Sequence, residues 1–300
     1  MKLGMNLLHQ QLAQEMQEVQ EYGLEGDSGS DPALASSVPC IIAPVRPGVL
    51  VISHGSPDDN WVALVDQAVA AVKAELPKGL PVEASFLELV EGRLIQDGID
   101  RLESQGITDL IVIPLFMSSG STHVDEIAYA LGVKDTPEKE TDMVRFRLSA
   151  RVFFGEPVDD DPLVAEMIWD KVKPLSRKPE QEALLLVGHG SRHDGFRQRW
   201  EQGISSLAVR VKDISGISVT DFALLNPDSV HKKVSYWQKR GYEVAIAPLF
   251  LSAGYFTKKE IPSRLEGLVY RYSGEALLPH PLLPRWMLNQ ILHIMNSVKL

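Results

Sequence analysis

Short apolar runs alternate with amphipathic segments along most of the chain. The runs, rich in β-branched residues, lie at 48–53, 82–87, 110–116 and 144–153, and again at 183–188, 217–225, 243–251 and 274–279. Patterns of helical period separate them at 60–76, 91–105, 124–133, 194–212, 227–240 and 258–270. Nearly continuous apolar strands that alternate with helices predict parallel sheets covered by helices on both faces.

Three segments of the first half return in the same order in the second. They are VLVISHGSPDDNW (49–61) with LLLVGHGSRHDGF (184–196), FLELVEGRL (86–94) with FALLNPDSV (222–230), and PLFMSSGSTHVDEI (114–127) with PLFLSAGYFTKKEI (248–261). The offsets are 135, 136 and 134 residues, which indicates an internal duplication. The predicted fold is therefore α/β, with two duplicated Rossmann-like domains, each on a parallel four-stranded sheet, and a cleft between them.

The duplication also predicts the domain boundaries. We expect the first domain at residues 46–155, a helix and linker at 156–181, and the second domain at 182–300. Residues 1–45 combine a polar stretch, EGDSGSDPALASS, with an apolar series at Met5, Leu8, Leu12, Met16 and Val19. This predicts an N-terminal helix and a flexible tether. The helix is compatible with a homodimer contact and equally with packing on its own domain.

Composition narrows the class of protein. The chain has 300 residues, 44% of them hydrophobic and 23% charged, as expected for a globular protein. The single cysteine, Cys40, excludes an intramolecular disulfide and a cysteine-ligated iron–sulfur cluster within one chain, and it favours a reducing compartment. Since no apolar run has the length of a signal-peptide core or a membrane span, we expect a cytoplasmic protein without a membrane partner.

Three candidate metal ligands stand where predicted strands end. His54 follows VLVIS, Glu88 closes VEASFLEL, and His123 lies in the loop after LIVIPLF. Because ligands of parallel sheets bind outside the carboxyl ends of the strands, the three side chains are expected to point into one crevice. Two imidazoles and a carboxylate suit divalent cobalt, nickel, iron or zinc and leave coordination positions open.

The second copy keeps only part of this set. In the repeat frame His189, Leu224 and Thr257 stand at the positions of His54, Glu88 and His123. The shared histidine is therefore also compatible with a structural task in the HGS turn, whereas the frame does not require the other two side chains. Glu126, which repeats as Glu260, could favour the positive end of a helix or handle protons beside His123.

Charge is distributed unevenly between the halves. Residues 46–155 carry a net charge of −7 and residues 181–300 a net charge of +5, within −10 for the whole chain. Arg192 and Lys258 stand where the first copy has uncharged residues. This favours a polyanionic small molecule in the cleft, although a solvated face with ion pairs between the halves is also compatible. The acidic total and the lack of interleaved aromatic residues argue against a nucleic-acid partner.

The combination of motifs resembles the class II tetrapyrrole chelatases. It consists of HGS after the first strand, FLEL at the end of the second, and PLFMSSG followed closely by a histidine after the third. The chain is similar over residues 46–298 to the sirohydrochlorin cobalt- and ferrochelatases of cobalamin and sirohaem synthesis. The resemblance implies a chelatase-like fold and insertion of a divalent metal, cobalt or iron, into sirohydrochlorin or a related acidic tetrapyrrole.

The resemblance also implies roles for the candidate residues. His54 and His123 would deliver the metal and take up protons, Glu88 would serve metal or proton passage, and Glu126 is a further catalytic candidate. A neutral imidazole can perform either task. No permanently bound cofactor is implied, because the metal (Co²⁺, Fe²⁺ or Ni²⁺) is a substrate.

Contacts with the substrate carboxylates are inferred from charge and not from the resemblance. Arg192 and Lys258 are the main candidates, with Arg197 as a further one. Hydrogen bonds are expected from Ser118, Ser119, Ser121 and helix N-terminal amides. Two other functions stay open, namely a non-catalytic tetrapyrrole or metal carrier on the same fold and an unrelated α/β enzyme for an acidic or phosphorylated metabolite. Against the latter, neither GxxxxGK[ST] nor GxGxxG opens a helix.

Overall fold

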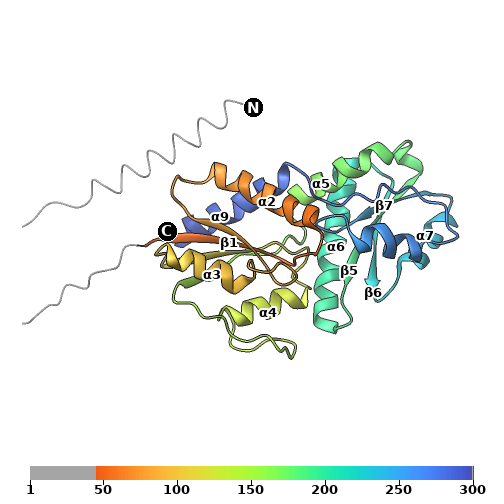
Figure 1. The fold of residues 1–300 in the computed structure, drawn as a ribbon. Helices are drawn as coiled ribbons and strands as arrows, with labels where there is room; N and C mark the ends of the chain where they lie inside the picture. The colour runs from red at the N-terminus through yellow and green to blue at the C-terminus, as the bar shows by residue number, and fades with distance from the viewer. Residues whose placement is uncertain (1–44, 299) are drawn as a thin grey trace, which may run out of the picture. The chain divides into compact units, whose positions relative to one another are not determined.

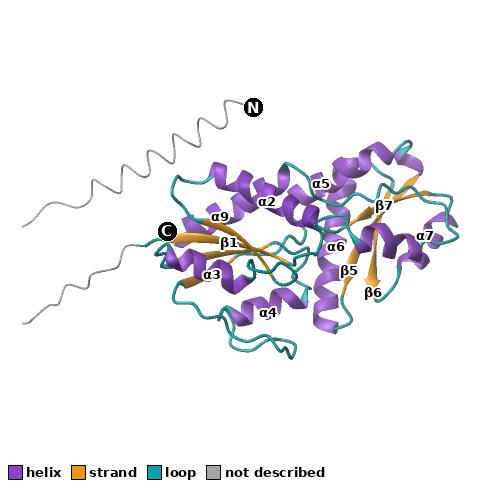
Figure 2. Ribbon diagram, in the orientation of Figure 1, coloured by secondary structure: helices purple, strands orange, loops and turns teal. Residues whose placement is uncertain are grey.

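The structure, a computed structural model, describes residues 45–298 and residue 300. Residues 44–300 form one compact unit that contains two parallel sheets flanked by helices (Figures 1 and 2). The helix, tether and homodimer contact expected of residues 1–45 lie outside the described residues. Among the helices that the structure describes, none is long and apolar enough to cross a membrane.

The first sheet has the strand order β2-β1-β3-β4 and is parallel throughout. Its strands are β1 (Pro47–Ser53), β2 (Val82–Phe86), β3 (Asp109–Pro114) and β4 (Arg151–Phe154). Alternate residues of β1 enter different cores, since Val51 packs with α2 (Asp59–Glu75) and α9 (Leu282–Val298), and Ile52 packs with α3 (Ile95–Ser104) and α4 (Thr122–Ala130). Helices thus cover both faces, which explains why most residues of these strands are apolar on both sides.

The second sheet has the order β6-β5-β7 and is also parallel. Its strands are β5 (Glu182–Gly190), β6 (Val219–Asn226) and β7 (Glu243–Pro248). One face packs on α5 (Pro162–Val172) and α6 (Asp194–Ser215), and the other packs on α7 (Val230–Gln238) and α8 (Ile261–Arg264). The predicted parallel α/β architecture with two duplicated halves is confirmed.

The fourth strand predicted for the second sheet, at residues 274–279, is wrong. Within the described part of the chain, that edge carries an isolated bridge between Ala245 and Arg271 and no further strand. The amides of Leu277 and Leu278 donate instead to the carbonyls of Phe250 and Leu251, beyond the end of β7. The run is apolar because its side chains are buried in the core, and burial alone does not distinguish a strand from an irregular segment.

The two halves exchange their last helices. Helix α5 follows the first sheet in sequence but packs on α6 and β7, and α9 ends the chain but packs on α2 and β3. One continuous core therefore includes Val51 of β1, Leu186 of β5 and the buried Trp286 and Met287 of α9. Since each fully buried large apolar side chain contributes roughly 1.5–3 kcal/mol, neither half keeps its full core without the other.

A buried carboxylate anchors the start of the second sheet. Glu182 is 0% exposed and accepts hydrogen bonds from the Ser176 hydroxyl (2.6 Å) and from the amides of Arg177 (2.6 Å) and Lys178 (2.8 Å). The guanidinium of Arg271 lies 2.8 Å away. Burial on its own raises the pKa of Glu182, but these donors outweigh it and lower the pKa to about 2.

This network predicts a pH-dependent stability. The folded pKa of Glu182, about 2, lies below the ordinary value of 4.5, so its stabilisation is complete above pH 4.5 and disappears as the pH falls toward 2. We expect Glu182→Gln to lower the free energy of unfolding at pH 7 by about 3 kcal/mol, because the fully buried carboxylate is lost and the partly buried Arg271 keeps only Glu243, at 3.3 Å, as a charged partner. Chemical denaturation between pH 2 and 7 measures this. Glu275→Gln removes an exposed partner of Lys171 and serves as the control, with an expected change below about 0.5 kcal/mol.

Candidate active site

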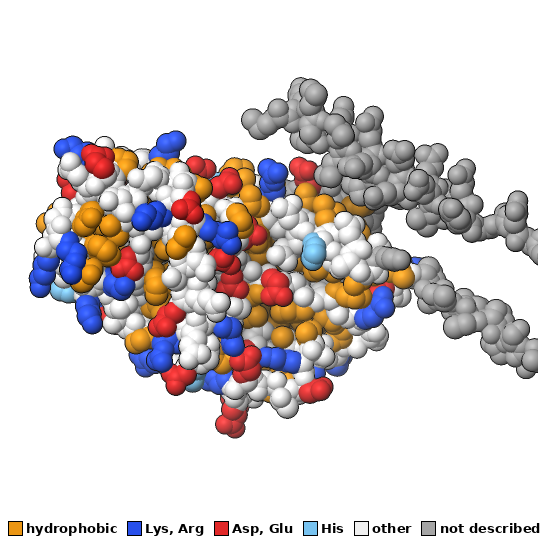
Figure 3. Space-filling model, turned by 180° about the vertical axis from the view of Figure 1, so that it is seen from behind, with side chains coloured by type: hydrophobic (Ala, Val, Ile, Leu, Met, Phe, Trp, Pro, Cys, Tyr) orange, Lys and Arg blue, Asp and Glu red, His pale blue; other side chains and the backbone are white. Residues whose placement is uncertain are grey.

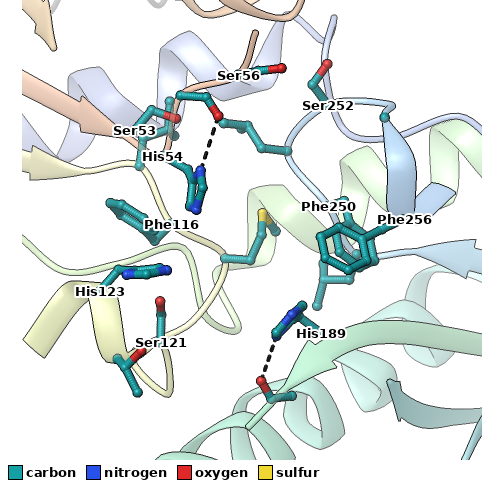
Figure 4. Close-up of a pocket in the computed structure, with 18 of the residues that line it drawn as sticks. Ser53, His54, Ser56, Phe116, Ser121, His123, His189, Phe250, Ser252 and Phe256 are labelled. Atoms are coloured by element: carbon teal, nitrogen blue, oxygen red, sulfur yellow. Dashed lines mark hydrogen bonds between the residues drawn. The ribbon is translucent and has the colours of Figure 1, made fainter. Parts of the chain in front are cut away.

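A cavity of about 690 Å³ lies at the carboxyl ends of the two central strands. The loops after β1 and β3 line it from the first half, and the loops after β5 and β7 line it from the second (Figure 4). In a parallel sheet these loops emerge at the same edge, so the duplicated motifs face each other across the cavity.

Two imidazoles share the wall of the first half. The rings of His54 and His123 have centroids 5.2 Å apart and planes inclined by 73° (Figure 4). Nδ1 of His54 lies 3.1 Å from the carbonyl oxygen of Gly55, and Nδ1 of His123 lies 3.1 Å from Oε2 of Glu126. Because both oxygens can only accept, each neutral ring carries its proton on Nδ1 and keeps a free lone pair on Nε2. The wall can therefore bind a divalent metal or accept protons.

Glu126 lies behind this wall and not in the cavity. It comes after the first turn of α4, whose N-cap is Ser121, and its side chain is largely buried. The sequence left open whether Glu126 favours the positive end of a helix or handles protons beside His123. Its position beside His123 supports the second role. A carboxylate on Nδ1 orients the His123 ring and stabilises it when it gains a proton.

Glu88 is a neighbour of His54 only. Its Oε1 lies 3.6 Å from Nε2 of His54, and its side chain is half exposed outside the cavity wall. Among the described residues no three His, Cys, Asp or Glu side chains are gathered closely enough to hold a metal ion. His54 thus has one expected ligand on each side. Glu88 lies toward solvent and His123 lies toward the cavity, and Glu88 and His123 do not form one site with it.

The turn after β1 identifies the true counterpart of Glu88. Gly55 and Gly190 both have positive φ values, 99° and 75°, and a Cβ there would lie 1.9 Å from the Glu88 carbonyl oxygen and 2.1 Å from the Asn226 carbonyl oxygen. Only glycine fits so close to a neighbouring backbone. Asn226 therefore corresponds to Glu88, and the sequence pairing of Glu88 with Leu224 is wrong, since Leu224 lies in the core.

The second half repeats the geometry of the first histidine. Nδ1 of His189 lies 3.0 Å from the carbonyl oxygen of the following residue, as it does at His54. The ring that faces it belongs to Phe256, with centroids 5.2 Å apart and planes inclined by 87°. Phe256 therefore takes the place that His123 takes in the first half (Figure 4).

The pairing of His123 with Thr257 is accordingly wrong. Thr257 is 1% exposed, and its hydroxyl bonds to the backbone of Gly254. The helix after β7 begins with a π-helical turn, η3 (Phe256–Glu260), where the first half has regular α4. The π-helical turn holds one more residue per turn than a regular α-helix. Residues at its start therefore occupy places one position away from those that the sequence repeat predicts, and the register matches again at the end of the turn.

The three predicted serines have different surroundings. Ser121 lines the cavity, as Figure 4 shows. Ser118 is buried, and its hydroxyl accepts from the amide of Gly120. Ser119 donates its amide to Asp159, and its carbonyl accepts from Arg199 at 3.1 Å. Ser118 and Ser119 therefore hold the loop in place and lie outside the cavity wall.

The three cations predicted to bind substrate carboxylates lie in different places relative to the cavity. Arg192 lines the cavity, whereas Lys258 is exposed outside the wall. Arg197 pairs with Asp194 at 2.6 Å and with Glu201 at 4.0 Å, so its charge is already partnered. On the face seen in Figure 3, basic and acidic side chains are interspersed and form no single patch.

The cavity is more aromatic than the sequence patterns predict. Six aromatic side chains from both halves line it: Trp61, Phe116, Trp200, Phe250, Tyr255 and Phe256. Phe250 and Phe256 are stacked, with centroids 5.3 Å apart and planes inclined by 17°. Among the described residues of the lining, none is Asp or Glu. The signal was present in the repeated PLF motif, whose phenylalanine enters the cavity in both copies.

Similar proteins include several named chelatases. The chain is 29% identical over 178 residues to the sirohydrochlorin ferrochelatase of Bacillus subtilis, a match that takes in 57% of this chain and 62% of that protein. It is 25% identical over 138 residues to the sirohydrochlorin cobaltochelatase of Methanopyrus kandleri, which takes in 42% of this chain and 94% of that protein. The second relative is thus about as long as one half of this chain.

Solved structures share the fold. SirB from Bacillus subtilis with Fe³⁺ superposes with a TM-score of 0.66 at 21% identity, over 85% of this chain and 98% of that one. CbiX, described as the terminal enzyme for biosynthesis of siroheme in denitrifying bacteria, superposes with a TM-score of 0.56 at 16% identity, over 82% of this chain and 98% of that one. The family model described as CbiX matches residues 48–175 and 183–293, once in each half. With both of its duplicated halves matched, the chain belongs to the CbiX family.

Proposed function

We propose that this protein inserts a divalent metal, cobalt or iron, into sirohydrochlorin or a closely related acidic tetrapyrrole. The observation that carries the proposal is the pair of free Nε2 atoms, on His54 and His123, at one wall of an aromatic cavity whose described lining contains no Asp or Glu. The names of the similar proteins support the same activity. The metal is a substrate, and the proposed reaction requires no permanently bound cofactor.

The two histidines can serve the metal and the protons in turn. Insertion places one divalent cation in the macrocycle and releases two pyrrole N–H protons, so charge balances when both protons leave. We assign the Nε2 atoms of His54 and His123 to hold the partly dehydrated metal beside the ring. Once the metal has moved to the pyrrole nitrogens, the same lone pairs are free to accept protons. Glu126 then stabilises the charged His123 ring, and Glu88 links His54 to solvent.

The rest of the cavity suits a flat acidic substrate. A macrocycle can pack its faces on aromatic side chains, among them Phe116 and the stacked Phe250 and Phe256. Its carboxylates would be repelled by acidic groups, and the described lining contains none. Arg192 is the cation on the wall that can bind a carboxylate, and Ser121 adds a hydroxyl.

The first test is metal insertion followed by absorbance, with Co²⁺ and Fe²⁺ and sirohydrochlorin. We expect the wild type to exceed the spontaneous rate with at least one metal, and His123→Ala to lower kcat about 100-fold or more. His231→Ala, on the outer surface of α7, is the control and should retain the wild-type rate. A wild type that binds sirohydrochlorin but gives no rate above the spontaneous one would identify a carrier instead.

The second test concerns Glu126 as a positioning residue. We expect Glu126→Gln to lower kcat about tenfold with little change in KM, because the amide can still accept from His123 but no longer balances its positive charge. Glu260→Gln is the matched control from the second half, where the carboxylate bonds Arg264 and Tyr255, and should change kcat less than twofold. Equal effects of the two substitutions would remove Glu126 from the mechanism.

The third test compares the two candidate cations. Arg192→Ala should raise KM for sirohydrochlorin several-fold and weaken the dependence of KM on salt, because a contact on the wall is lost. Lys258→Ala should raise KM less, since that ammonium lies outside the wall and acts only at a distance. A larger effect at Lys258 would show that the carboxylates bind at the rim and not at Arg192.

A further inference from the structure

We propose that Phe256 confines metal binding to the wall of the first half, and that the second wall lacks a metal site because of this one side chain. The inference rests on the proposed function, since it presumes that the His54 and His123 pair binds the metal. It makes Phe256 a residue that decides from which side the cation reaches the substrate.

The second wall retains most of what the first wall has. His189 lies at the end of the central strand β5, in a turn that matches the turn of His54, donates its Nδ1–H to the next carbonyl and keeps its Nε2 lone pair free. Its ring lines the cavity. Asn226, at the place of Glu88, contributes an amide oxygen that can ligate a cation, and its Nδ2 lies 3.4 Å from the His189 carbonyl oxygen.

What the second wall lacks is the second nitrogen. The ring of Phe256 faces His189 at the same centroid distance, 5.2 Å, that separates His54 from His123. A benzene ring offers no ligand and fills the volume that a coordinated cation and its waters would occupy. Stacking on Phe250 at 5.3 Å and edge contact with Tyr255 at 5.6 Å hold the ring in this position.

This arrangement has a consequence for the reaction. With a metal site on each wall, two cations would approach the same central nitrogens from opposite sides and repel each other. With Phe256 in place, one wall supplies the cation and the other offers an apolar ring to the opposite face of the macrocycle. Metal would then reach the substrate from one wall alone. The difference between the walls is a phenylalanine, Phe256, in place of a histidine, and the π-helical turn places it opposite His189.

Cobalt titration of the full chain tests this without substrate, with Co²⁺ absorption and calorimetry as readouts. We expect one Co²⁺ per chain in the wild type, two in Phe256→His, and one again in the double variant Phe256→His with His189→Ala. Thr257→His, at the position that the repeat frame would choose, should stay at one, because that side chain is buried and its hydroxyl bonds to the backbone of Gly254 instead of facing His189. Adding Asn226→Glu to Phe256→His should tighten the second site.

The outcomes separate this inference from the proposed function. If the wild type binds no Co²⁺, or if His123→Ala leaves binding intact, the proposed metal wall fails. If the wild type binds one Co²⁺ through His123 but Phe256→His still binds one, the role of Phe256 is overturned. Retention of the original site in Phe256→His shows that this variant is folded. Independently of any variant at 256, a loss of wild-type Co²⁺ binding in His189→Ala would also overturn the proposal.

Discussion

The hydrogen bond from the His54 ring to the carbonyl of Gly55 is the interaction on which the site depends. Gly55 can offer that carbonyl because it adopts a positive φ and lies against the Glu88 backbone, where a Cβ has no room. The bond occupies Nδ1 and thereby turns the free lone pair of Nε2 toward the cavity and Glu88. The same bond at His189 shows that this turn is a property of the duplicated fold, and that chemistry depends on what is placed opposite the ring.

The exchange of helices explains how two copies form a single cavity. Each sheet ends its strands at a cavity wall, and α5 and α9 each cross to the other half, so one core runs behind both walls. The loop that carries His123 is fastened to the second half as well, because Arg199 of α6 donates to the Ser119 carbonyl and pairs with Glu138 at 2.9 Å. The distance between the walls is therefore set by buried packing and by this contact.

The two walls differ in chemistry while sharing a backbone. The first carries two imidazoles supported by carboxylates, and the second carries one imidazole, a stacked aromatic pair and Arg192. Duplication supplies a second surface whose cavity-lining side chains can differ from those of the first, while one core behind both walls is shared. In the proposed reaction, a metal held at the first wall and the apolar surface with Arg192 on the second would suit a flat polyanion whose centre is reached from one face.

The pattern of apolar runs and the repeated motifs determined the α/β class, the duplication, the edge of the sheet that carries the site, and the two histidines on it. These follow from sequence because strand period, helix period and the order of motifs are local properties of the chain. Tertiary structure alone decided that Asn226 and Phe256, not Leu224 and Thr257, stand opposite the repeated turn. A π-helical turn and a shift in strand length change the register without changing the motif letters, and only packing against the neighbouring strand and loop shows where each side chain points.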